Sequence, residues 1–205
     1  MVEQVSGVST SLVRSESPLH GVASASHPTP GVRLRELCFR GHIVLRGDPA
    51  ETNLAEVVEQ LTGLPLPTTP MALVGDGEPS VQWISPDEWL LVLPPGETAR
   101  MVATMRAALR GHVAVVDVSG GQTIVALSGA DARSVLMKST PYDVHPDAFP
   151  PGKGVVSVFA KTMITIRCRG EMRWELIVRR SYADYVWRWL LDAGGEYGVV
   201  TLPPG

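Results

Sequence analysis

The chain has few cysteines and few aromatic residues. Its 205 residues include two Cys, and aromatic side chains make up 6%. Cys38 and Cys168 lie far apart without Cys-x-x-Cys spacing, which argues against a zinc or thioredoxin-like motif and predicts two buried, reduced thiols. A chain of this length buries enough apolar surface to fold without disulfides or a structural metal. One disulfide between the two thiols remains an alternative.

An excess of charge of one sign is also lacking. The 18 Lys and Arg residues and 21 Asp and Glu residues are spread along the chain and give a net charge of −3. Without a basic stripe, nucleic acid is not an expected partner. No apolar run reaches the roughly 18 residues of a membrane span, and the N-terminus lacks the order of a signal peptide. We therefore expect no membrane partner and a cytoplasmic location.

Motifs for metal and phosphate binding are missing as well. The five histidines are scattered, and no two are spaced to form a metal site on one helix. No glycine-rich dinucleotide or P-loop motif occurs, and Gly152-Lys153-Gly154 precedes a strand instead of opening a helix. We expect no catalytic residue, no metal and no cofactor on this chain.

Residues 1–30 are rich in Ser, Gly, Pro and Val without a sustained period, which predicts an extended N-terminal arm. The segment Ser17-Pro18-Leu19-His20 places one large apolar side chain between turn-forming residues. Leu19 and His20 are therefore candidates for docking onto a partner. A disordered tail also fits this composition.

Residues 31–111 have the pattern of a first α+β half. The alternation and the capping signals predict, in order, a hairpin over 32–45 that turns at 40–42, a helix capped by Asp48 and stopped at Gly63, strands over 71–74, 81–84 and 89–93, and a helix ending at Gly111.

Residues 112–205 repeat this order. They predict strands over 113–118 and 122–127 around a tight turn at 119–121, a short helix after the capping box at 128–131, strands over 162–168 and 174–178, and a helix after Ser181. In the strand over 162–168, Thr165, Arg167 and the following Arg169 are expected to face water. Two such halves predict a duplicated ferredoxin-like α+β fold, with antiparallel sheets covered by helices.

The last helix has a wide apolar surface. Trp187 and Leu191 lie beside its polar face and extend the apolar stripe beyond what contact with one sheet requires. They are candidates for a partner interface. The alternative is that the C-terminal tail covers them.

Four carboxylates at strand ends and in loops have the chemistry of a general base. Asp117 ends a strand and Asp143 lies in a proline-rich loop, and for Asp117 the sequence favours acceptance of backbone N–H groups in a turn over a general base. Asp143 has no second acid or His at useful spacing. Asp87 and Glu88 are adjacent, so on a strand their side chains would point in opposite directions and could not act as a pair.

Five segments in order carry a family resemblance: Trp83–Leu93 (Trp-Ile-Ser-Pro-Asp-Glu-Trp-Leu-Leu-Val-Leu), Val116–Ser119, Leu127–Leu136, Tyr142–Val144 and Val178–Leu190. Together they resemble the gamma subunits of heterotetrameric sarcosine oxidases, over about residues 17 to 197. That family is in turn similar to the folate-binding aminomethyltransferases of the glycine cleavage system. The resemblance implies their duplicated topology without their C-terminal barrel.

One departure from the folate enzymes bears on function. Where they hold the carboxylate that serves the folate nitrogen, this chain has Lys161–Thr165, which contains no acid. The resemblance therefore implies a non-catalytic subunit that stabilises the flavin-bearing subunits of an enzyme converting sarcosine to glycine, hydrogen peroxide and a one-carbon unit transferable to tetrahydrofolate. It implies alpha, beta and delta partner subunits that hold FAD, FMN, NAD and zinc. A free-standing folate-binding enzyme and an assembly factor for flavin attachment are the alternatives.

Overall fold

The computed structural model describes residues 15–205, so the first part of the predicted arm, residues 1–14, lies outside the described residues. The helices are α1 (Leu54–Thr62), α2 (Thr98–Ala108), α3 (Ala132–Ser139) and α4 (Ala183–Gly194). The strands are β1 (Val32–Leu37), β2 (Gly41–Arg46), β3 (Leu73–Val74), β4 (Ser80–Ser85), β5 (Glu88–Leu93), β6 (Ala114–Asp117), β7 (Gln122–Ser128), β8 (Lys153–Phe159), β9 (Thr162–Gly170), β10 (Arg173–Arg179) and β11 (Val199–Thr201).

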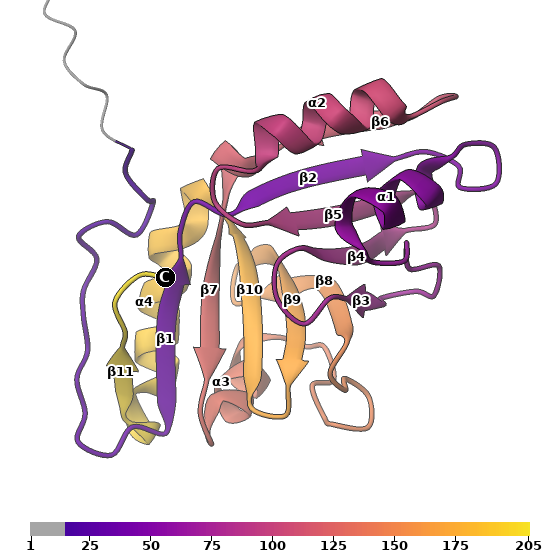
Figure 1. Ribbon diagram of the computed structural model, residues 1–205. Coiled ribbons are helices and arrows are strands. Elements are labelled where there is room, and N and C mark those ends of the chain that lie inside the picture. Colours follow the sequence, from indigo (N-terminus) through magenta and orange to yellow (C-terminus); the bar gives the residue numbers. More distant parts are fainter. Residues whose placement is uncertain (1–14) are drawn as a thin grey trace, which may run out of the picture.

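The strands form two sheets. A six-stranded sheet has the order β11-β1-β7-β10-β9-β8, and a five-stranded sheet has the order β3-β4-β5-β2-β6. All pairings are antiparallel except that of β1 with β11. In Figure 1, α1 and α2 accompany the five-stranded sheet, while α3 and α4 lie by the six-stranded one. The predicted α+β class with antiparallel sheets covered by helices is confirmed.

The two sheets are built on the same plan. From β2 to β6 the chain runs strand, helix, three strands, helix, strand, and from β7 to β11 it repeats this order. The spatial order β3-β4-β5-β2-β6 corresponds to β8-β9-β10-β7-β11, with β1 inserted between β7 and β11. Each plan contains the ferredoxin-like arrangement of two helices over an antiparallel sheet. The strands of residues 15–205 lie in these two open sheets, and none of them forms a barrel.

Two of the predicted hairpins are wrong. Residues 32–45 do not fold on themselves, because β1 joins the six-stranded sheet and β2 the five-stranded one. The same holds for β6 and β7, which the short 3₁₀ turn Ser119–Gly121 carries from one sheet to the other. Strand pairing therefore does not follow the division between 31–111 and 112–205: β6 completes the first sheet, and β1 is a member of the second.

The helix starts also differ from the capping predictions. Asp48 accepts a hydrogen bond from the Ala50 N–H at 2.8 Å in a turn, and α1 begins later, at Leu54. The capping boxes predicted at Ser128 and Ser181 form no side-chain cap on α3 or α4. Gly63 ends α1 with a φ of 72°, as its position predicts, because glycine adopts this left-handed conformation without a steric cost.

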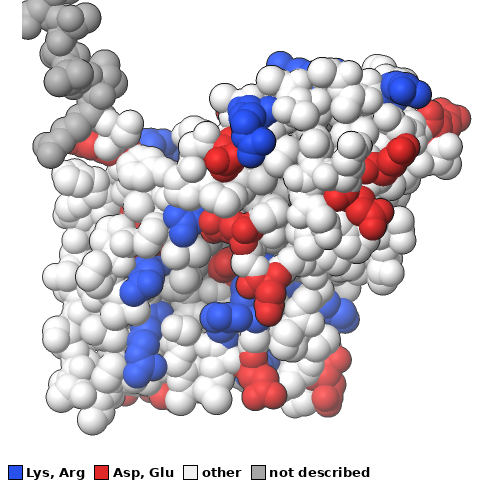
Figure 2. Space-filling view, viewed as in Figure 1, with Lys and Arg blue, Asp and Glu red and all other residues white. Residues whose placement is uncertain are grey.

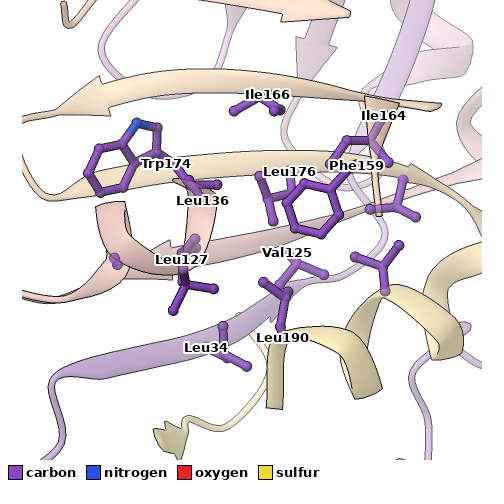
Figure 3. Packing of buried hydrophobic residues seen from close by; sticks show 14 of the residues in the cluster. Leu34, Val125, Leu127, Leu136, Phe159, Ile164, Ile166, Trp174, Leu176 and Leu190 are labelled. Carbon is purple, nitrogen blue, oxygen red and sulfur yellow. The ribbon is translucent and has the colours of Figure 1, made fainter. Parts of the chain in front are cut away.

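The larger hydrophobic core lies between the six-stranded sheet and its helices. Figure 3 shows Leu34, Val125 and Leu176 of the sheet facing Leu136 of α3 and Leu190 of α4, with Phe159 and Trp174 in the same layer. A second core fills the space between α1, α2 and the five-stranded sheet, and includes Trp89 from the predicted β4–β5 hairpin. None of the helices in residues 15–205 is both long and apolar enough to cross a membrane.

Candidate functional site

The most unexpected feature of the structure is a buried ionic cluster between the two sheets. Arg167 and Arg169 of β9 each approach the Glu175 carboxylate of β10, at 3.2 Å and 2.9 Å. Arg167 has no exposed side-chain surface and Arg169 is nearly as buried. The prediction that they face water is wrong, because the five-stranded sheet covers this end of the strands. Alternation along β9 gives the face of each residue but not what covers that face.

Both arginines reach across to the five-stranded sheet. The Ser80 hydroxyl on β4 accepts hydrogen bonds from Arg167 at 2.5 Å and from Arg169 at 3.2 Å. Arg169 also donates to the Gly75 and Gly77 carbonyls, at 2.6 and 3.0 Å. Burial lowers the pKa of Arg167 to about 9, against the raising effect of Glu175, so the guanidinium is charged at neutral pH. The cluster joins the two sheets by charge-assisted hydrogen bonds.

His42 of β2 lies on the same inter-sheet layer. It is fully buried, and neither ring nitrogen has a hydrogen-bond partner among residues 15–205. Burial, reinforced by the nearby positive charge of Arg167, lowers the pKa of His42 from 6.5 to about 4. The folded protein therefore holds His42 neutral at pH 7.

This depressed pKa predicts a pH-dependent stability. Between pH 6.5 and 4 the unfolded chain binds a proton at His42 that the folded chain does not, so the free energy of unfolding falls as the pH falls. The free energy of unfolding should fall on going from pH 7 to pH 4.5. In His42→Leu this fall should be about 2–3 kcal/mol smaller than in the wild type. Urea unfolding at the two pH values measures it, with His112→Leu, at an exposed position, as the control. Equal losses in both variants would contradict the assignment.

Beyond this cluster, part of the six-stranded sheet has no cover among residues 15–205. Val156 and Val158 of β8 lie opposite Thr165 and Met163 of β9, and residues directly opposite share a face of the sheet. Gly154 and Arg167 lie on that same face. Gly154 packs against Gln82 of the five-stranded sheet, and Arg167 donates a hydrogen bond to Ser80 of that sheet. Farther along, Val156 is 46% exposed, Val158 43% and Met163 52%. We call Val156, Val158 and Met163 the open face.

Cationic and aromatic side chains border the open face. A shallow hollow there is lined by Val158, Lys161, Thr162, Met163, Arg179 and Tyr182. It coincides with Lys161–Thr165, the stretch that in the folate enzymes carries a carboxylate, and no Asp or Glu is among these lining residues. The carboxylate that would serve a folate nitrogen is therefore missing from this hollow, and its lining residues do not fit that part of tetrahydrofolate.

The candidate carboxylates Asp117, Asp143 and Asp87 lie in turns. Asp117 accepts from the Ser119 N–H at 2.9 Å and its hydroxyl at 2.5 Å, which confirms the favoured turn role. Asp143 accepts from the His145 N–H at 2.9 Å. Asp87 accepts from the Ser85 hydroxyl at 2.8 Å and pairs with Arg46 at 2.9 Å, and these contacts lower its pKa. The three side chains do not converge on one pocket.

The arm lies along the chain itself. Leu19 is buried in the larger core, and Trp187 of α4 is buried and donates its indole N–H to the Ala23 carbonyl at 2.9 Å. Leu191 is half-buried against the same core, and His20 is exposed. Of the four interface candidates, Leu19 and Trp187 thus contribute to contacts within the chain. The alternative predicted from the sequence was that the C-terminal tail covers Trp187. In the structure, the Trp187 indole donates its hydrogen bond to the N-terminal arm.

Charged residues form no single-sign region on the visible surface. Figure 2 shows Lys and Arg interspersed with Asp and Glu over the face in view. Over residues 15–205, no three His, Cys, Asp or Glu side chains gather closely enough to hold a metal ion. Cys38 and Cys168 are free thiols, so the alternative of a disulfide between them is excluded, and burial raises the pKa of Cys168.

Comparison with known proteins agrees with this architecture. Sarcosine oxidase subunit gamma from Corynebacterium sp. (strain P-1) is 34% identical, over 92% of this chain and 93% of that protein. A chain of the heterotetrameric sarcosine oxidase from Corynebacterium sp. U-96, solved with pyrrole 2-carboxylate, superposes with a TM-score of 0.80 at 28% identity, over 89% of this chain and 96% of that one.

The glycine cleavage system aminomethyltransferase T from Bartonella henselae shares the fold alone. Its TM-score is 0.58 at 14% identity, over 90% of this chain and 49% of that one. This confirms the aminomethyltransferase-like topology predicted from the sequence. The family model described as sarcosine oxidase, gamma subunit family, matches residues 46–196. With a full-length relative at 34% identity and a matching solved chain, this protein belongs to the sarcosine oxidase gamma subunit family.

Proposed function

We propose that this chain is the gamma subunit of a heterotetrameric sarcosine oxidase, in which it has a structural role and stabilises the flavin-bearing subunits. The observation that carries the proposal is the near-complete match, in both directions, to a sarcosine oxidase subunit gamma. The assembly would oxidatively demethylate sarcosine to glycine, with formation of hydrogen peroxide and a one-carbon unit that can pass to tetrahydrofolate.

A structural role is supported by what the polar residues do. Asp117 and Asp143 are engaged in turns. The hollow beside Lys161 is lined without an acid. The buried charges Arg167, Arg169 and Glu175 pair with one another on β9 and β10, and both arginines donate hydrogen bonds to Ser80 of the other sheet. Each of these groups has a role in the fold that does not require substrate.

The remaining components follow from the same proposal. The alpha, beta and delta subunits would be the partners, and FAD, FMN, NAD and zinc would be held by them. The complex would be cytoplasmic, in agreement with the two free thiols.

Two other roles make different predictions. If the chain is a free-standing folate-binding enzyme, the isolated chain should bind tetrahydrofolate, and Asp143→Asn should abolish that binding. A factor that acts only during flavin attachment would be absent from the finished, active oxidase.

The proposal is tested by expressing the chain alone and together with the alpha, beta and delta subunits, followed by size-exclusion chromatography and native mass spectrometry. The expected result is one copy of this chain in an active, flavin-containing complex. A stable, colourless monomer that ignores the flavoprotein subunits would contradict it.

A further inference from the structure

The open face is an unusual surface for a chain that folds alone. The six-stranded sheet is covered on one side by α3 and α4 and on the other only in part by the five-stranded sheet. Ile177 of β10 is buried against Leu90 and Val92 of β5, whereas Val156, on the same row of the sheet, is not covered. Adjacent exposed apolar side chains of this kind mark contact surfaces.

The composition of the surroundings fits a protein interface. Tyr182 is 46% exposed next to Met163 in the hollow, and Arg179 lines the same hollow. Met, Tyr and Arg are the types enriched in the cores of protein interfaces, while Lys161 is typical of a polar rim. With two cations and no acid lining it, the hollow is complementary to a partner that carries Asp or Glu beside apolar side chains.

The edge of the sheet is a less suitable docking site than its face. Although β8 is an edge strand, the Ala160 N–H already donates to the Ser139 carbonyl at 2.6 Å, and the Ser157 and Thr140 hydroxyls lie 3.1 Å apart. At the other end of β8, Lys153 forms an isolated bridge with Ala72. Both ends of the edge are thus occupied, which hinders addition of a further strand.

We propose that the open face is the surface on which a flavin-bearing subunit of the oxidase docks, through a segment of apolar side chains flanked by Asp or Glu. This inference deepens the proposed function and rests on it. Met163 and Val158 would be the central contacts, and Lys161 and Arg179 would pair with the acidic flanks.

The test introduces charge into the open face and measures assembly. Val158→Asp combined with Met163→Asp in the full chain, co-expressed with the alpha, beta and delta subunits, should weaken assembly by about 30-fold or more, as for the loss of an interface hot spot. The matched control is Met137→Asp with Met172→Asp, which alters methionines that are 68% and 54% exposed away from the open face. Circular dichroism melting of the isolated chains should be the same for both double variants.

The outcomes separate this inference from the proposed function. If the wild-type chain does not co-assemble, the proposed function fails. If the wild type and both double variants assemble equally, the function stands and the open face is not the docking surface. The inference is also overturned if the isolated wild-type chain is a dimer that the open-face variant dissociates, because the occupant is then a second copy. Arg179→Glu should slow association and reduce its salt dependence.

Discussion

Replacement of Glu175 by glutamine is expected to lower the free energy of unfolding by about 3–5 kcal/mol, because it leaves buried positive charges without their counter-charge. The Glu175 carboxylate lies 3.2 Å from Arg167 and 2.9 Å from Arg169. Both arginine side chains are buried, so water cannot replace the lost counter-charge. Glutamine preserves the size of the side chain and therefore isolates the effect of the charge. Urea unfolding at pH 7 measures it.

An exposed ion pair provides the control for this prediction. Asp184 and Arg188 form a pair at i, i+4 on the solvent side of α4, at 3.0 Å. Asp184→Asn should change the free energy of unfolding by about 0.5 kcal/mol or less, since exposed helix pairs contribute little. Similar small effects for Glu175→Gln and Asp184→Asn would show that the buried cluster does not stabilise the contact between the sheets.

Replacement of Trp187 by alanine is expected to cost about 3–5 kcal/mol, through the cavity left in the core. The indole is 4% exposed, and its N–H bonds to the Ala23 carbonyl at 2.9 Å. The same change should release the arm around Leu19 and Val22, which packs on this core. Denaturant unfolding gives the energy, and faster proteolysis within residues 15–30 reports the release.

Phenylalanine at position 187 separates packing from hydrogen bonding. Trp187→Phe retains most of the apolar contact but loses the bond to Ala23 and one ring of the indole, so a loss of about 1–2 kcal/mol is expected, smaller than that of Trp187→Ala. If Trp187→Ala leaves the proteolysis of the arm unchanged, the arm is not held by this side chain.

Local patterns in the sequence predicted most elements of the fold. The apolar spacing of the last helix, with Val186 and Leu190 buried, matches α4, and the Trp83–Leu93 segment forms the expected β4–β5 hairpin. Asp117 was predicted as a turn residue because a short acid at a strand end readily accepts backbone N–H groups, and it does so. These features depend on neighbours close in the sequence.

Features that depend on distant contacts could not be predicted. The short segment Cys38–Arg40 is compatible with a hairpin turn and also with passage between two sheets, and only the remaining strands decide between them. Similarly, Arg167 alternates with Ile166 as in a strand with one wet face, but β4 supplies Ser80 to that face. The open face has the same apolar alternation and remains uncovered, so periodicity alone does not distinguish the two.

The proposed structural role of this chain is tested most directly by the turnover per assembled oxidase. The complex is prepared with the wild-type chain, with Asp117→Asn and with Asp143→Asn, its content is quantified by flavin absorbance, and sarcosine-dependent hydrogen peroxide formation is measured. The account predicts the same turnover per complex in all three. A tenfold or larger loss of turnover in a fully assembled Asp117 or Asp143 variant would contradict it.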